Sequence, residues 1–162
     1  MDTTQQPGSL TAEPPHSIAQ ARVDDKGRLK LPAEFLTYLR ALKIEKVFIT
    51  TVDLQIARIY PVSVWNANEN YFANAGEQAE LAGDVAYIAK YYGGDSEIDS
   101  QGRVLVPSEL RRELDLESQP VWLDCYNGRI NVAGKKIHEE RLHRAKVGLL
   151  DKVKTLEKQG MK

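Results

Sequence analysis

The 162-residue chain has a single cysteine, Cys125, and no apolar run approaching the roughly 20 residues that cross a bilayer. One cysteine excludes an intramolecular disulfide framework and a metal site built from several cysteines. Residues 1–17 contain no Lys or Arg and little apolar mass, so we expect a disordered tail there and no secretory leader. The sequence therefore predicts a cytoplasmic protein with no membrane partner.

An excess of charge of one sign is also missing, because 22 Lys and Arg face 23 Asp and Glu, a net charge of −1. A nucleic-acid-binding function would therefore need a local basic patch. The chain has no phosphate-binding loop, dinucleotide fingerprint or Gly-x-Ser-x-Gly motif. His138 and His143 are five positions apart, which places them on different faces of a helix and excludes a shared metal site. We expect no catalysis, no small-molecule substrate, no cofactor and no metal.

The chain does contain an internal repeat. Residues 23–35, from Val23 to Phe35, recur as residues 98–110 with a constant offset of 75. The identical positions are Asp24, Gly27, Arg28, Pro32 and Glu34 in the first copy, and Asp99, Gly102, Arg103, Pro107 and Glu109 in the second. The apolar positions between them exchange only among Val, Ile, Leu and Phe. Two copies of one structural unit therefore make up most of the chain.

Each copy predicts a strand, a tight turn, a second strand and a helix. In the turn motif Asp-x-x-Gly-Arg, Asp24 and Asp99 can accept backbone N–H bonds, while Gly27 and Gly102 adopt positive φ. We interpret these four residues as structural. The prolines that follow suit the first turn of a helix, and apolar spacing predicts helices over 33–42 and 108–116.

Other elements follow from local patterns. Hairpins are expected from strands 46–52 and 56–60, and from strands 120–126 and 129–132, which Asn127-Gly128 connects. Two helices are expected within 61–92, with a break near 74–76, and one amphipathic helix over 136–158. The expected domains are a tail (1–17), a first repeat with connecting helices (18–92), a second repeat (93–135) and a C-terminal amphipathic helix (136–162).

Over about residues 21–133 the chain resembles the MraZ family, part of the wider group of AbrB-like swapped-hairpin proteins. The resemblance rests on the tandem Asp-x-x-Gly-Arg copies and on the step Ile59-Tyr60-Pro61-x-x-x-Trp65. It implies an α+β fold: a small swapped-hairpin β-barrel formed by the two tandem repeats, with interposed helices and a C-terminal helix. It also implies a transcriptional regulator, a repressor of a cell-division and cell-wall gene cluster. Such a protein would form a ring-like homo-oligomer on repeated promoter boxes of double-stranded DNA in the nucleoid.

The candidate DNA-binding residues surround the first turn. Arg28 is the first candidate, followed by Lys30, Lys26, Arg22 and Arg103. We expect the incoming and outgoing strands of one copy to form a ribbon that fits the major groove, with Arg22 and Arg28 on one face. Arg103 ranks last because its neighbours Gln101 and Leu105 are neutral. Each aspartate could also bind its own arginine across the turn, which would make both arginines structural.

Two alternative functions stay open at this point. The chain could be an AbrB-like antitoxin that regulates its own synthesis, or an oligomeric scaffold with little DNA binding. Residues 135–162 hold nine Lys or Arg against four Asp or Glu. That segment could contact DNA, pack between subunits, or lie as a solvated amphipathic helix across its own domain, which we favour.

Overall fold

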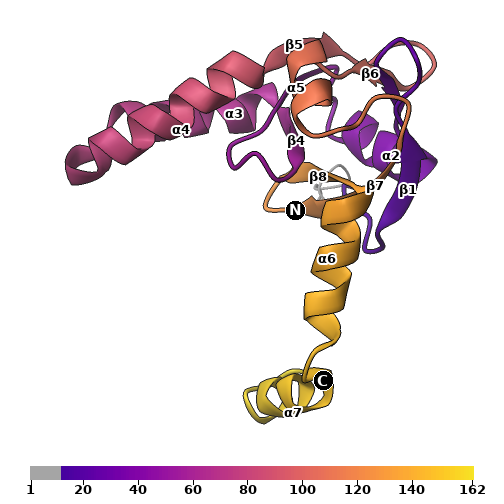
Figure 1. The fold of residues 1–162 in the computed structure, drawn as a ribbon, viewed down its shortest axis with the longest axis vertical. Helices are drawn as coiled ribbons and strands as arrows, with labels where there is room; N and C mark the ends of the chain where they lie inside the picture. Colours follow the sequence, from indigo (N-terminus) through magenta and orange to yellow (C-terminus); the bar gives the residue numbers. More distant parts are fainter. Residues whose placement is uncertain (1–11) are drawn as a thin grey trace, which may run out of the picture.

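The computed structural model describes residues 12–162, so most of the expected N-terminal tail lies outside the described residues. The fold is α+β, as expected, with antiparallel strands and helices α2 to α7 (Figure 1). The strands are β1 (Ala19–Arg22), β2 (Arg28–Lys30), β3 (Lys46–Thr50), β4 (Ala57–Pro61), β5 (Gly94–Glu97), β6 (Arg103–Leu105), β7 (Pro120–Tyr126) and β8 (Arg129–Gly134). The helices are α2 (Ala33–Ala41), α3 (Val62–Ala73), α4 (Ala79–Tyr92), α5 (Ser108–Glu113), α6 (Lys135–Lys146) and α7 (Leu149–Lys158).

Strands of both repeats interleave in one six-stranded antiparallel sheet, in the order β1-β7-β8-β4-β3-β5. The two predicted hairpins are present as β3–β4 and β7–β8. Each incoming strand pairs with the hairpin of the other repeat: β1 with β7, and β5 with β3. The remaining strands, β2 and β6, pair with each other as a separate two-stranded sheet.

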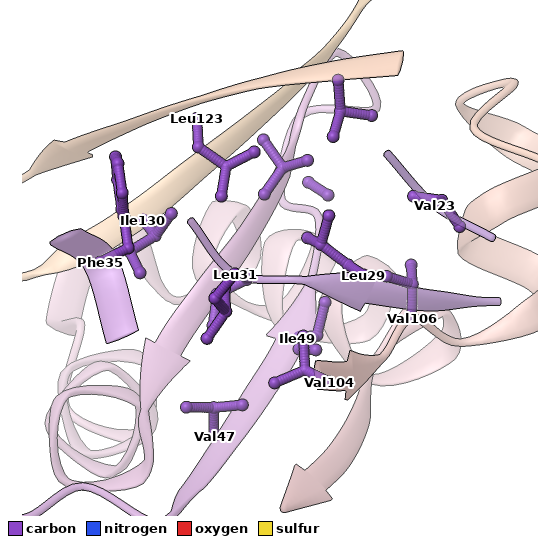
Figure 2. Packing of buried hydrophobic residues seen from close by; sticks show 14 of the residues in the cluster. Val23, Leu29, Leu31, Phe35, Val47, Ile49, Val104, Val106, Leu123 and Ile130 are labelled. Atoms are coloured by element: carbon purple, nitrogen blue, oxygen red, sulfur yellow. The ribbon is translucent and has the colours of Figure 1, made fainter. Parts of the chain in front are cut away.

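One apolar core lies between these two sheets (Figure 2). Leu29 and Val104 contribute to it from the two-stranded sheet, and strand alternation directs Ile49 and Leu123 inward from the larger one. All four side chains are at most 1% exposed. The core therefore depends on both repeats, and neither repeat encloses it alone.

Helices α3 and α4 form the predicted pair between the repeats and extend to one side of the sheets (Figure 1). A short 3₁₀ turn at Gly76–Gln78 separates them, close to the expected break. Trp65 of α3 joins them to the sheet, because its ring lies 4.9 Å from the rings of both Phe48 and Tyr60. Of the helices in residues 12–162, none is long and apolar enough to span a membrane.

The prediction of a single helix over 136–158 is wrong. The chain forms two helices there, α6 and α7, because Val147 is extended and Gly148 takes a left-handed conformation with φ of 63°. The apolar stripe does not cover the domain either, since Leu142, Leu149 and Leu156 are each about half exposed. Figure 1 shows α6 leading away from the sheets and α7 at its far end. Our preferred interpretation, a helix lying across its own domain, is therefore also wrong.

Candidate nucleic-acid interface

The outer face of the β2–β6 ribbon gathers charged residues from both repeats. In its antiparallel register Arg28 lies opposite Leu105, and Lys30 lies opposite Arg103. The central pair, Leu29 and Val104, is buried beneath, so strand alternation directs the four flanking side chains outward. Three cations and one leucine therefore share a small exposed face.

The ribbon has approximate twofold symmetry. The repeat offset of 75 makes Arg28 equivalent to Arg103. A twofold rotation about the Leu29–Val104 pair exchanges these two equivalent positions in the antiparallel register. Two reciprocal backbone bonds flank the ribbon: Leu31 N–H donates to Gly102 O, and Val106 N–H donates to Gly27 O, both at 2.9 Å. Each turn is thus fixed by the outgoing strand of the other repeat.

The prediction that the incoming and outgoing strands of a single repeat form the ribbon is therefore wrong. Strands β1 and β2 meet only at the isolated bridge between Val23 and Leu29. The two strands have other partners: β1 pairs with β7, and β2 pairs with β6. Arg103 consequently lies next to a cation, Lys30, which its sequence neighbours did not indicate.

Both turns have the same internal hydrogen bonds. Asp24 Oδ1 accepts the backbone N–H groups of Lys26 at 2.9 Å and Arg28 at 2.8 Å. Asp99 Oδ1 accepts the equivalent groups, including that of Arg103, at 2.9 Å. The backbone φ is 81° at Gly27 and 77° at Gly102, in the region that favours glycine. The turn geometry thus follows from the shared motif and is independent of the variable residues within it.

Each turn aspartate also orients its arginine. Arg28 Nε donates to Asp24 Oδ2 at 3.1 Å, and Arg103 Nε donates to Asp99 Oδ2 at 2.8 Å. The backbone N–H of Arg28 is the main factor that lowers the pKa of Asp24, and the backbone N–H of Arg103 does the same for Asp99. Both carboxylates are therefore ionised at neutral pH and can hold the guanidinium groups in place.

These ion pairs use one edge of each guanidinium. Within the part of the chain that the structure describes, neither Nη atom of Arg28 or Arg103 donates a hydrogen bond to another residue. A guanidinium carries five N–H groups, so four remain on each arginine for an external acceptor. The side chains of Arg28 and Arg103 are 33% and 24% exposed, enough for a ligand to reach them.

The other candidates lie at different places around the ribbon. Lys30 is exposed on its outer face, and Lys26 is exposed in the first turn. Arg22 is exposed at the end of β1, where its Nη2 donates to the carbonyl of Ser118 at 2.8 Å. Arg22 therefore has a partner in the turn just before β7 and is less central to the ribbon than Lys30.

Sequence reasoning missed Arg111 of α5. Its guanidinium packs against Gly27, donates to the Val106 carbonyl through Nη1 and pairs with Glu117 through Nε at 2.9 Å. The repeat offset matches Arg111 with Leu36, and Leu36 packs against Gly102 in the same way. Comparing the helices of the two copies could have indicated this contact, because both helices support the turn of the other repeat.

The described residues offer little for other chemistry. Among residues 12–162, no three His, Cys, Asp or Glu side chains are grouped so as to hold a metal ion. Partial burial, followed by the charge of Asp124, raises the pKa of Cys125 to about 11. A thiol with that pKa is almost entirely protonated at neutral pH and is a poor nucleophile.

Comparison with known proteins identifies relatives, although no protein-family model matches the chain. It is 37% identical over 100 residues to the transcriptional regulator MraZ of Acidobacterium capsulatum, covering 62% of this chain and 68% of that protein. Identity to the MraZ protein of Koribacter versatilis is 31% over 99 residues, covering 60% and 67%. The MraZ protein of Thiobacillus denitrificans is 27% identical over 104 residues, covering 64% and 70%. This degree of identity and coverage, together with the duplicated turn motif, shows that the chain belongs to the MraZ family.

Proposed function

We propose that the chain is a sequence-specific transcriptional regulator that binds double-stranded DNA through the outer face of the β2–β6 ribbon. The observation that carries the proposal is the pairing of one strand from each repeat, which brings Arg28, Lys30 and Arg103 together. The relatives are named transcriptional regulators. A two-stranded ribbon has the width to enter the major groove of DNA.

The roles of these residues follow from their exposed donors. Arg28 and Arg103, oriented by their aspartates, present Nη groups that can contact guanine O6 and N7 or a phosphate. Lys30 and Lys26 add positive charge for phosphate contacts, and Arg22 extends this surface. In this proposal Asp24, Gly27, Asp99 and Gly102 have a structural role, because they shape the turns that end in the two arginines.

A few cations per subunit bind DNA weakly, so the proposal includes a homo-oligomer. Several ribbons on one ring-like assembly would engage repeated promoter boxes together, and linked sites can gain about 10²–10⁴ in affinity without new contacts. Family resemblance supports a repressor of a cell-division and cell-wall gene cluster, acting in the cytoplasm at the nucleoid. It also supports describing the two interleaved repeats as a swapped-hairpin barrel.

A salt series tests the DNA-binding proposal. Fluorescence anisotropy with a labelled duplex of repeated boxes and a random duplex gives the dissociation constant at each salt concentration. We expect steep weakening with salt, and Arg28→Ala to reduce the slope of log K against log salt by about one for each ribbon engaged. Lys90→Ala, which removes an exposed cation from α4, is the matched control and should leave the slope unchanged.

The other outcomes separate the remaining alternatives. Equal effects of Arg28→Ala and Lys90→Ala would overturn the assignment of the ribbon. Absence of binding to any duplex at low salt would overturn DNA binding and favour an oligomeric scaffold. Tight binding to a co-purified protein partner, with DNA binding only in its presence, would favour an antitoxin.

A further inference from the structure

The C-terminal helix α7 presents an apolar side that the described residues leave uncovered. Leu149, Leu150 and Leu156 are 51%, 66% and 51% exposed, and Val153 is half-buried beside them. Helix α6 holds α7 away from the sheets (Figure 1). A helix of ten residues is marginal in water by itself, so its stability requires a surface that covers this apolar side.

The spacing on α7 is that of a coiled coil. Leu149, Val153 and Leu156 are separated by four and then three residues, as at positions d, a and d of a heptad. A β-branched residue at a with leucine at d favours two parallel strands over three or four. The sequence of this side therefore favours a pair of helices, and the charges that flank it decide the direction of the pair.

The charges that flank the apolar side agree with a parallel pair of identical helices. In the same heptad Lys152 occupies position g and Glu157 occupies position e. In a parallel pair, position g of one helix faces position e of the partner, five residues further along the sequence. Lys152 of each copy would therefore face Glu157 of the other copy, which gives two ion pairs. An antiparallel pair would bring Lys152 against Lys152 instead, which is repulsive.

We propose that α7 is a self-association element that pairs with α7 of a second copy as a short parallel coiled coil. This interface is separate from the ribbon and does not depend on DNA binding. The pairing rests on the homo-oligomer of the proposed function in one respect. Other contacts between subunits would hold two copies of α7 close together and raise the effective concentration of so short a helix. Gly148, with its left-handed backbone, sets the direction in which α7 leaves α6.

Disulfide cross-linking tests the pairing in the full chain. Cys125→Ser provides a background without native cysteine, and Val153→Cys or Leu156→Cys then places one thiol on the apolar side. Under mild oxidation we expect a covalent dimer at both positions, because equal positions face each other in a parallel pair. Lys158→Cys, on the opposite side of α7, is the matched control and should cross-link at least about tenfold less.

Charge exchange tests the register. We expect Lys152→Glu and Glu157→Lys each to reduce cross-linking through Val153→Cys by about threefold to fivefold, and the double exchange to restore it. Lys158→Glu makes the same change in net charge as Lys152→Glu and should have no effect. The same variants should bind the repeated-box duplex like the parent chain, which separates a failure of this interface from a failure of DNA binding.

Two results would overturn the proposal. One is equal cross-linking at positions 153 and 158, which would show that the apolar side does not face its equivalent in another copy. The other is co-sedimentation with phosphatidylglycerol vesicles that Lys152→Glu and Lys158→Glu weaken equally, without cross-linking at 153. That result would make α7 a membrane-surface helix.

Discussion

An arginine in an ion pair can still bind a ligand, and the two turns show how. On the side chains of their arginines, Asp24 and Asp99 bind only the Nε edge of the guanidinium, so the aspartates restrict the rotamers and leave the Nη groups available. The structural and functional interpretations of Arg28 are therefore compatible. An oriented guanidinium also loses less side-chain entropy when it binds.

The turn carboxylates should make the fold sensitive to acid. The folded pKa values of Asp24 and Asp99 lie below the usual value near 3.9, so their ionised forms stabilise the fold above about pH 4. This stabilisation is lost as the pH falls from about 4 through the lowered pKa values. Asp24→Asn with Asp99→Asn should be less stable at pH 7 and should lose less stability below pH 4. Urea unfolding followed by circular dichroism measures both effects.

Asn is the informative replacement, because its side-chain oxygen can still accept the backbone N–H bonds, while the charge and the bond accepted from the arginine Nε are removed. Asp25→Asn, at an exposed neighbouring position, serves as the control and should retain the parent pH profile. If the double variant and the parent lose stability in parallel below pH 4, the two turn carboxylates do not contribute to the acid sensitivity.

The turn glycines differ in how closely neighbouring atoms approach. Gly27 and Gly76 both have positive φ, but a Cβ at Gly27 would clash with the Arg111 guanidinium, whereas a Cβ at Gly76 would meet open space. Gly76→Ala should cost about 1 kcal/mol from backbone strain alone. Gly27→Ala should cost more than Gly76→Ala, because Arg111 must also move from its bonds with Val106 and Glu117. Equal losses in the free energy of unfolding would show that the Arg111 side chain moves away from Gly27 without a loss of stability.

At the scale of the element, the ribbon separates stability from recognition. Its inner side chains, Leu29 and Val104, are at most 1% exposed, while Leu105 on the outer face is 51% exposed. Leu29→Ala should lower the free energy of unfolding by about 2–5 kcal/mol, through lost burial and the cavity left behind. Leu105→Ala should change it by less than about 0.5 kcal/mol. Denaturant titration distinguishes the two, and similar losses would show that the faces are not assigned correctly.

Elements with a local signal were predictable from the sequence. Asn127 and Gly128 have φ of 50° and 78°, the conformation that their dipeptide favours between two strands, and the β7–β8 hairpin forms around them. The break between α3 and α4 likewise follows from local composition. These predictions hold because the turn residues and the helix period act over a few neighbours.

The elements that the sequence did not predict depend on distant partners. Nothing in the alternation of Arg28, Leu29 and Lys30 indicates that β2 pairs with β6, 75 residues away, rather than with β1. The break at Gly148 was missed because an apolar spacing runs through it on both sides. The ion pairs of the turns were predicted as one alternative, but only the structure shows which guanidinium nitrogens they use.

For the whole molecule, the distribution of charge matters more than its sum. The net charge is −1, yet residues 135–162 carry nine Lys or Arg against four acids, so the remainder of the chain is net negative. The ribbon is thus a local basic feature on an acidic body. Long-range attraction to DNA is weak for such a molecule, so the DNA binding that we propose would depend on contacts made at the ribbon itself.

The approximate twofold symmetry of the ribbon leads to a prediction of gained function. Leu105 is the symmetry equivalent of Lys30, and it lies exposed beside Arg28. Leu105→Lys would complete a face of four cations and add one phosphate contact per ribbon. If the proposed interface is correct, DNA affinity at low salt should rise by up to about tenfold for each ribbon engaged, and the salt slope should steepen by about one.

The matched control changes the same residue type elsewhere. Leu81 on α4 is 63% exposed, so Leu81→Lys makes the same change in charge and hydrophobicity on a helix outside the ribbon. Anisotropy titrations of both variants over a salt series separate a local contact from a general effect of net charge. A gain for Leu105→Lys alone supports the ribbon as the interface. Equal gains for the two variants would mean that DNA responds to total charge, and the symmetric face would then have no special role.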